Sequence, residues 1–131
     1  MPVDWKALFS AAEAARERAY APYSKFKVGA AVLAADGTIH LGCNVENASY
    51  GLTICAERHA LGRAVVEGKK PAAIAIVVDS RRPTPPCGAC RQVIAELCAP
   101  DVEVRSRTPK GKESRYRVGD LLPDAFGPDD L

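Results

Sequence analysis

The sequence predicts an α/β fold in which helices flank one mixed five-stranded sheet, giving three layers, α/β/α. Three observations point to this class. Two cysteine-containing runs continue into segments with helical spacing of apolar residues, Asp36-Gly37 is a strong hairpin signal, and residues 72–78 are continuously apolar. The expected order is helix, strand, strand, helix, strand, helix, strand, strand. At 131 residues, the chain is expected to be one domain, 1–131, that buries about two thirds of its unfolded surface.

The first three elements follow from a capping residue and from the hairpin signal. Asp4 is a suitable N-cap for a helix that continues to about Ala19, with small and apolar residues along one face. Residues 28–33 and 38–44 are predicted as strands, joined at Asp36-Gly37. These two strands should therefore be antiparallel neighbours.

The second helix is expected over Thr53 to Glu67, with Thr53 as its N-cap and Gly68 as its stop. Its predicted apolar stripe consists of Ile54, Leu61, Val65 and Val66. This helix begins beside a cysteine, so its N-terminus is a candidate location for metal-binding or catalytic residues.

The second half of the chain repeats the alternation of strand and helix. The apolar run 72–78 suits a buried strand, and residues 87–97 are predicted as a helix that follows the stiff Pro85-Pro86 pair. Short strands are expected over 102–105 and 115–118. The basic, turn-rich stretch 105–117 is expected to be a solvated loop or hairpin.

Composition excludes some classes of partner and compartment. A net charge of +2 is too small to indicate a nucleic-acid partner. No apolar run approaches the roughly 20 residues that span a bilayer, and the segment 1–5 does not begin a secretory signal. An odd number of cysteines, five, suits a reducing compartment, so we expect a cytoplasmic protein without a membrane partner. Cys43 and Cys98 are most simply core thiols.

The most informative residues are Cys55, Cys87 and Cys90, together with Glu57. Three thiolates can bind one zinc ion and leave a fourth position for water, which is typical of a catalytic rather than a structural site. Zinc lowers the pKa of bound water from about 15.7 toward 7, and a nearby carboxylate can carry the proton. Cys55 and Glu57 can converge on one ion only if it lies off the helix N-terminus, where the helix dipole also lowers a thiol's pKa.

Two other interpretations stay open at this point. His59 follows Cys55 by four residues, so it could be a fourth ligand and close the site into an inert zinc module. Its place one turn further back favours a packed or surface histidine. Alternatively, Cys87 and Cys90 could be a redox dithiol, although such a pair needs neither a third cysteine nor a glutamate.

Five runs in this order resemble one family. They are 21–31 (APYSKFKVGAA), 44–50 (NVENASY), 55–58 (CAER), 86–92 (PCGACRQ) and 121–126 (LLPDAF). The pattern of Cys-x-Glu followed by Pro-Cys-x-x-Cys is a signature of zinc-dependent deaminases. Over nearly the whole chain, the sequence is similar to the small cytidine deaminases that act on free nucleosides. The resemblance implies the cytidine deaminase-like fold and a single catalytic domain.

The resemblance also implies an activity, hydrolytic deamination of cytidine and deoxycytidine to uridine and deoxyuridine plus ammonia in pyrimidine salvage. One Zn²⁺ per subunit would be bound by the three cysteines. Glu57 would take the water proton, deliver it to N3 of the base and later protonate the leaving amine. Arg58 would hydrogen-bond to the ligating sulfurs and restore some Lewis acidity, with Arg91 as a weaker second candidate.

Further residues are assigned to the nucleoside by the same resemblance. Phe26 would stack on the pyrimidine, Asn44, Val45 and Glu46 form the segment that binds the ribose 3′-hydroxyl, and the backbone N–H of Ala56 would bind the base carbonyl. Ala48, Tyr50 and Phe126 would reach the ligand of a neighbouring subunit. The family's small-chain members are homotetramers, so we expect a homotetramer with shared active sites.

Other substrates remain as alternatives. The chain could deaminate a nucleoside antibiotic such as blasticidin S or a base within a polynucleotide, although a polynucleotide enzyme should have an aromatic-lined groove and aromatics are only 6% of this chain. Two features depart from the family pattern. His59 stands where threonine or a small apolar residue is expected, and the loop 80–84 is unusually basic.

Overall fold

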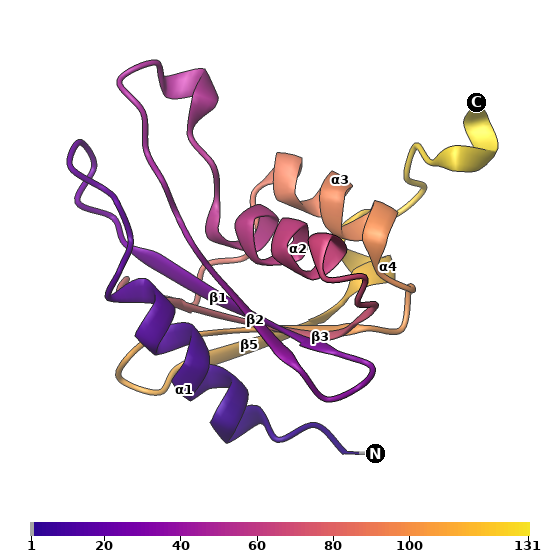
Figure 1. The fold of residues 1–131 in the computed structure, drawn as a ribbon, viewed down its shortest axis with the longest axis horizontal. Helices are drawn as coiled ribbons and strands as arrows, with labels where there is room; N and C mark the ends of the chain where they lie inside the picture. Colours follow the sequence, from indigo (N-terminus) through magenta and orange to yellow (C-terminus); the bar gives the residue numbers. More distant parts are fainter. Residues whose placement is uncertain (1) are drawn as a thin grey trace.

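The computed structural model describes residues 2–131 and contains one mixed sheet of five strands in the order β2-β1-β3-β4-β5. Helix α1 lies on one face of this sheet, and helices α2 and α3 lie on the other (Figure 1). The predicted three-layer α/β/α class is confirmed. The elements are α1 (Trp5–Arg16), β1 (Val28–Ala34), β2 (Ile39–Cys43), η1 (Tyr50–Leu52), α2 (Ala56–Val66), β3 (Pro71–Val78), α3 (Gly88–Leu97), β4 (Glu103–Arg107), β5 (Glu113–Arg117), α4 (Val118–Leu121) and η2 (Pro128–Asp130).

Side-chain alternation along the central strand β3 builds a hydrophobic core on each face of the sheet. Ile74 and Ile76 pack in the larger core, under α2 and α3. Ala73, Ala75 and Val77 point the other way and pack in the core under α1. Because both faces are covered, β3 is apolar at every position, as the continuous run in the sequence predicts.

Glycines at two strand positions bring the helices close to the sheet. A Cβ on Gly42 of β2 would lie 2.4 Å from the backbone oxygen of Ala56 and 2.4 Å from the backbone nitrogen of Ala60, both in α2. A Cβ on Gly29 of β1 would lie 2.0 Å from the backbone oxygen of Ala12 in α1. Only a residue without a side chain allows these approaches, and the sequence analysis did not single out either glycine.

The first helix ends at Arg16, three residues before the predicted end near Ala19. Asp4 is the N-cap, as predicted, and accepts a hydrogen bond from the backbone nitrogen of Ala7 at 3.1 Å. After Arg16 the chain makes two tight turns, and the backbone nitrogen of Tyr20 then donates to the oxygen of Asn44 at 3.0 Å. This long-range pairing ends the helix where local propensity would have continued it.

The predicted start of α2 at Thr53 is wrong by two residues, because Cys55 is the N-cap. Thr53 belongs to the preceding turn, where its nitrogen donates to the oxygen of Tyr50 at 3.1 Å. Ile54 pairs with Val45 in an isolated antiparallel bridge. The helix therefore starts only after this bridge is complete.

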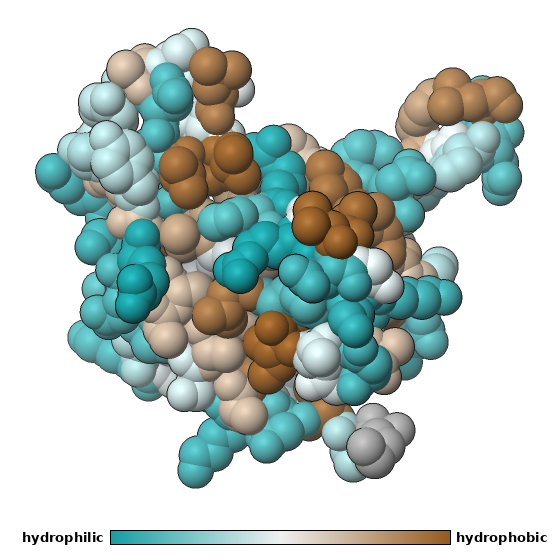
Figure 2. Space-filling model, viewed as in Figure 1, coloured by the Kyte–Doolittle hydropathy of each residue, from teal (hydrophilic) through white to brown (hydrophobic). Residues whose placement is uncertain are grey.

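The predicted apolar stripe of α2 is also largely wrong. Leu61 is buried, but Val65 and Val66 are 53% and 84% exposed and Ile54 is 43% exposed. The buried face instead consists of Ala56, Glu57, Ala60, Leu61 and Ala64. Small residues suit this face because α2 lies against Gly42. Apolar groups accordingly remain on the surface over α2 and the segment before it (Figure 2).

The stretch 105–117 is a hairpin of β4 and β5, one of the two predicted forms. Its turn contains Gly111 with a φ of 93°, which suits glycine. Two of its arginines pack on α1 rather than extending into solvent. Arg105 lies 4.1 Å from the ring centre of Trp5, and Arg107 lies 4.0 Å from that of Phe9. No helix within residues 2–131 has the length and apolar character needed to cross a membrane.

Candidate metal centre and active-site pocket

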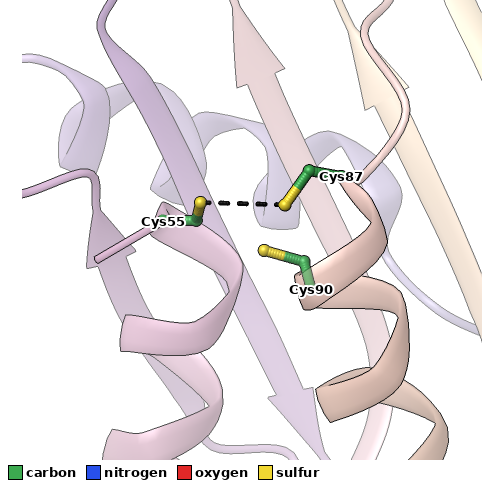
Figure 3. Close-up of side chains that lie close together, drawn as sticks. All are labelled: Cys55, Cys87 and Cys90. Atoms are coloured by element: carbon green, nitrogen blue, oxygen red, sulfur yellow. Dashed lines mark hydrogen bonds between the residues drawn. The ribbon is translucent and has the colours of Figure 1, made fainter. Parts of the chain in front are cut away.

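Cys55, Cys87 and Cys90 converge on one point between the N-termini of α2 and α3 (Figure 3). Their sulfur atoms all lie within 4.8 Å of one another, and the Sγ atoms of Cys55 and Cys87 are 4.0 Å apart. Cys55 is the N-cap of α2 and Cys87 the N-cap of α3, while Cys90 lies in the first turn of α3. Two helix ends therefore face the thiol cluster, as the sequence spacing predicts.

This donor set fits zinc. A tetrahedral zinc with bonds of about 2.3 Å to sulfur places its ligands about 3.8 Å apart, close to the separation of Cys55 and Cys87. Among residues 2–131, the side chains that lie close enough together to hold a metal ion are these three cysteines, without a histidine or a carboxylate. Three protein ligands leave one tetrahedral position for a non-protein ligand.

The structure does not support the alternative in which His59 closes the site as fourth ligand, because the group of possible metal ligands among residues 2–131 does not include His59. The Nδ1 atom of His59 lies 3.2 Å from the backbone nitrogen and 3.1 Å from the backbone oxygen of Cys43, so the ring is turned toward strand β2. It is the packed histidine that the helix geometry favours.

The thiol cluster lies beside a half-buried cation, the guanidinium of Arg58. The Nη2 atom of Arg58 is 3.6 Å from the Sγ of Cys55 and 3.2 Å from the backbone oxygen of Thr53. A hydrogen bond from Cys90, followed by the one from Arg58, lowers the pKa of Cys55 to about 5. The same bond to Cys55, followed by burial, raises the pKa of Cys90. The cluster therefore favours a thiolate at Cys55 even before a metal binds.

Arg91, the weaker candidate for a sulfur contact, faces elsewhere. Its Nε donates to the backbone oxygen of Pro86 at 2.8 Å, and its Nη1 donates to that of Leu121 at 3.1 Å. The guanidinium thus binds carbonyl groups on two separate segments.

Glu57 is a carboxylate held in a dry environment next to the thiols. It lies in the first turn of α2, is only 6% exposed and lines the same pocket as Cys55. Burial, with a smaller contribution from Cys55, raises the pKa of Glu57 from its ordinary value of 4.5 to about 7. A carboxyl that titrates near neutral pH can both accept and donate a proton under working conditions.

This pKa gives a prediction for the metal-free protein. Between pH 4.5 and 7 the folded chain keeps a proton on Glu57 that the unfolded chain has lost, so the free energy of unfolding falls as pH rises. The Gln variant of residue 57 has no such titration. Relative to Glu57→Gln, wild type should be about 3 kcal/mol less stable at pH 8 than it is well below pH 4.5, where the two proteins should be equally stable. Urea unfolding of both proteins in a chelator measures this, and a difference that does not change with pH would contradict the assignment.

Two of the thiols, Cys55 and Cys87, line a pocket of about 250 Å³ together with Glu57. Of the predicted site residues, the pocket brings together Phe26, Asn44, Glu46, Cys55, Ala56, Glu57 and Cys87. Ala56 is the first residue of α2, where a backbone N–H has no partner within the helix. Cys90 and Arg58 do not line the pocket, but each lies next to Cys55.

Asn44 and Glu46 hold the loop that carries Phe26. The side-chain oxygen of Asn44 accepts from the backbone nitrogen of Val28 at 2.9 Å, and its amide nitrogen donates to the oxygen of Phe26 at 2.7 Å. Glu46 accepts from the backbone nitrogens of Tyr23 and Ser24 at 3.0 and 3.2 Å and from the Ser24 hydroxyl. These bonds set the position of the aromatic ring at the pocket wall.

The sequence analysis gave no role to two polar residues of the pocket wall. Ser24 binds Glu46, and its Oγ also accepts from the backbone nitrogen of Phe26 at 3.0 Å. A serine two residues before a loop aromatic is a local turn signal that could have identified it. Thr84, at the end of the basic loop 80–84, lines the pocket too. That loop therefore does reach the site entrance.

Four predicted substrate contacts lie away from the pocket of a single chain. Val45 is paired with Tyr20 and Ile54 in backbone bridges. Ala48 and Tyr50 lie on the loop before α2, where Tyr50 is 77% exposed. Phe126 is 59% exposed on the C-terminal segment, which extends past α3 away from the sheet (Figure 1). None of the four lines the pocket.

Three cysteines at the ends of two helices, with a glutamate two residues after the first cysteine, are typical of zinc-dependent deaminases. Residues 3–106 match the family model described as the cytidine and deoxycytidylate deaminase zinc-binding region. A cytidine deaminase of Halalkalibacterium halodurans is 52% identical over 130 residues, which cover 98% of each chain.

Solved structures agree with these sequence matches. A cytidine deaminase from Burkholderia pseudomallei superposes with a TM-score of 0.92 at 54% identity, covering 95% of this chain and 100% of that one. The cytidine deaminase from Mycobacterium tuberculosis gives 0.82 at 43% identity, covering 96% and 99%. The chain belongs to the cytidine deaminase family, and it is therefore an enzyme that acts on a small-molecule substrate.

Proposed function

We propose that this chain is a single catalytic domain, 1–131, that deaminates cytidine and deoxycytidine hydrolytically, releasing ammonia and forming uridine and deoxyuridine. One observation carries the proposal: a buried carboxyl with a raised pKa, Glu57, lines the same pocket as Cys55 and Cys87, two members of a three-thiol group that could hold a metal. The reaction requires a nucleophile at C4 of the base and a group that moves protons. We assign the enzyme to pyrimidine salvage in the cytoplasm.

The proposed chemistry assigns the metal site to Cys55, Cys87 and Cys90, with one zinc in each subunit. Bound there, zinc would supply the Lewis acidity that makes a water-derived nucleophile available at neutral pH. Glu57 accepts one proton of that water and transfers it to N3 of the base as oxygen bonds to C4. It then accepts the proton of the new C4 hydroxyl and gives it to the amine, so that the C4–N bond breaks, ammonia leaves and C4 becomes a carbonyl. Its pKa near 7 suits both directions of transfer. Arg58 keeps positive charge beside the sulfur of Cys55.

The walls of the pocket suit a pyrimidine nucleoside. Phe26 offers an aromatic face for stacking on the base, and the N–H of Ala56 is directed from the helix end toward its carbonyl. Asn44 and Glu46, on the segment through Val45, would bind the ribose hydroxyl with the lone pairs and N–H that their loop contacts leave free. A pocket with an apolar wall and a few polar groups is the usual form of a small-ligand site.

We propose that the enzyme works as a homotetramer with shared active sites. The pocket of one chain, about 250 Å³, is below the usual range of about 300–1,000 Å³ for small-ligand sites. Ala48, Tyr50 and Phe126 lie outside it on projecting segments, where they could reach a neighbouring chain. The exposed apolar groups over α2 offer a surface for such association (Figure 2).

The direct test is loss of cytidine absorbance near its ultraviolet maximum, with zinc content measured on the same protein. We expect turnover of cytidine and deoxycytidine in zinc-containing protein, and its loss after chelation. Blasticidin S and single-stranded oligonucleotides serve as comparison substrates. If zinc-containing protein turned over neither nucleoside, the proposal would be wrong.

Phe126→Ala should weaken substrate binding without loss of metal. Because the ring is exposed in one chain and proposed to enter a neighbour's pocket, its removal should raise KM for cytidine about tenfold, the effect expected for one lost base–aromatic stacking contact. Steady-state kinetics and zinc analysis measure the two effects separately. Leu131→Ala, an exposed apolar residue at the end of the same segment, is the matched control. Unchanged kinetics in Phe126→Ala would argue against a shared pocket.

A further inference from the structure

Two segments that are far apart in sequence meet at one side chain, Arg91. The metal turn, residues 86–90, provides two of the three thiols. The C-terminal tail, residues 122–131, leaves the body of the protein just after α4. We propose that Arg91 is a positioning residue that couples the metal turn to the C-terminal tail, so that zinc binding and docking of the tail strengthen each other.

On the side of the metal turn, Arg91 holds both carbonyl groups that flank Cys87. Its backbone nitrogen donates to the oxygen of Cys87 at 2.9 Å, and its side-chain Nε donates to the oxygen of Pro86 at 2.8 Å. Peptide groups are planar, so fixing these two carbonyls restricts rotation of the backbone on either side of the Cys87 Cα. The bond from the backbone nitrogen is a helical one that any residue except proline would make at this position. The side chain of Arg91 contributes the hold on the Pro86 carbonyl, and it thereby helps to orient the backbone from which the Cys87 thiol projects.

On the side of the tail, the same guanidinium holds the point where the tail begins. Nη1 of Arg91 donates to the backbone oxygen of Leu121 at 3.1 Å. Leu121 is buried and is the last residue of α4, where a carbonyl has no partner within the helix. Gln92 adds a second, more distal contact, from its side-chain nitrogen to the oxygen of Phe126 at 2.9 Å. The tail is thus attached to the first turn of the helix that carries Cys90.

The planar guanidinium is what links the two contacts. Its N–H groups have a rigid relative geometry. If the Pro86 carbonyl moves and Nε follows it, the Nη1–H that donates to the Leu121 carbonyl changes direction as well. When zinc binds Cys87 and Cys90, the metal turn becomes more restricted, and the tail loses less entropy on docking. By thermodynamic linkage, a docked tail must increase zinc affinity by the same factor.

A simpler account would give Arg91 a purely electrostatic effect on the thiolates. Arg91→Lys separates the two accounts, because lysine keeps the positive charge but cannot hold two carbonyls in fixed directions. Arg115→Lys is the matched control, since Arg115 is exposed on β5. Gln92→Ala removes only the distal tail contact.

The experiment measures zinc affinity by competition with a chromophoric chelator, and the rate of chymotryptic cleavage after Phe126, followed by mass spectrometry, with and without zinc. In wild type, removing zinc should speed cleavage, because the Phe126 carbonyl is then less often held by Gln92. Arg91→Lys should bind zinc about 10- to 100-fold more weakly, and its tail should be cleaved fast whether or not zinc is present. Gln92→Ala should show faster cleavage after Phe126 with zinc affinity close to wild type, and Arg115→Lys should match wild type in both.

Two results would overturn the inference. One is a rate of tail cleavage in wild type that does not respond to zinc, and this result is decisive even if Arg91→Lys does not fold. The other is a zinc affinity that stays at the wild-type level in Arg91→Lys but falls in Arg91→Gln. That result would mean that Arg91 affects zinc affinity through its charge alone. The inference rests on the proposed zinc site but uses no turnover measurement, so its failure would leave the proposed deamination intact.

Discussion

Glu57→Gln is expected to lower kcat for cytidine about 10²- to 10⁴-fold while zinc content stays at the wild-type level. Glutamine has nearly the same shape, so the buried first turn of α2 should pack as before. The amide cannot accept the proton of the attacking water or return one to the leaving amine. It also lacks the negative charge that burial makes costly, so the variant should fold at least as stably at neutral pH.

Single-turnover measurements and zinc analysis on the same preparation test this expectation. Glu67→Gln is the matched control, because Glu67 lies at the other end of α2 and is exposed. A zinc-containing Glu57→Gln protein with wild-type kcat would contradict the proposal that Glu57 transfers the protons. Loss of zinc in the variant would instead indicate that the carboxyl contributes to metal binding.

Gly42→Ala is expected to destabilise the fold by about 3 kcal/mol and to reduce turnover about 100-fold. The added Cβ would meet backbone atoms of Ala56 and Ala60 at 2.4 Å, and backbone cannot rotate away as a side chain could. Helix α2 must therefore move off the sheet. Because Cys55 and Glu57 lie at its N-terminus, this movement should displace a thiol and the carboxyl relative to Cys87 and Cys90.

Gly62→Ala is the matched control for this prediction. Gly62 lies in the same helix, and a Cβ there would meet no atom within 4 Å. Alanine in a helix interior should stabilise the protein by about 0.5–1 kcal/mol. Urea unfolding and zinc competition on both variants measure the effects on stability and on the metal site. Equal stability of Gly42→Ala and Gly62→Ala would contradict close packing of α2 on Gly42.

The residues that carry chemistry were predictable from sequence because their spacing is local. Cys55 and Glu57 are two apart, Cys87 and Cys90 three apart, and both pairs stand where helices begin. Helix N-termini attract anionic groups for reasons that depend on a few residues only. The strand hairpin at Asp36-Gly37 and the buried strand β3 were predictable on similar grounds.

Other features required the tertiary structure. Val65 and Val66 have the spacing of a core stripe, yet they are exposed, because Gly42 brings the small-residue face of α2 onto the sheet. His59 has the spacing of a fourth ligand, yet it contacts the edge of β2. Periodicity shows which residues share a face of a helix, but it does not show which face meets the sheet.

The sequence alone determined the donor types, the α/β class and the family resemblance, because these depend on residue identity and short-range order. Only the tertiary structure decided that the thiols gather into one cluster without His59, that Glu57 is buried beside them, and that Arg91 joins the metal turn to the C-terminal tail. The contacts between Cys55 and Cys87 and between Arg91 and Leu121 join residues 32 and 30 positions apart. The packing of helices on both faces of a sheet, rather than any local preference, brings such segments together.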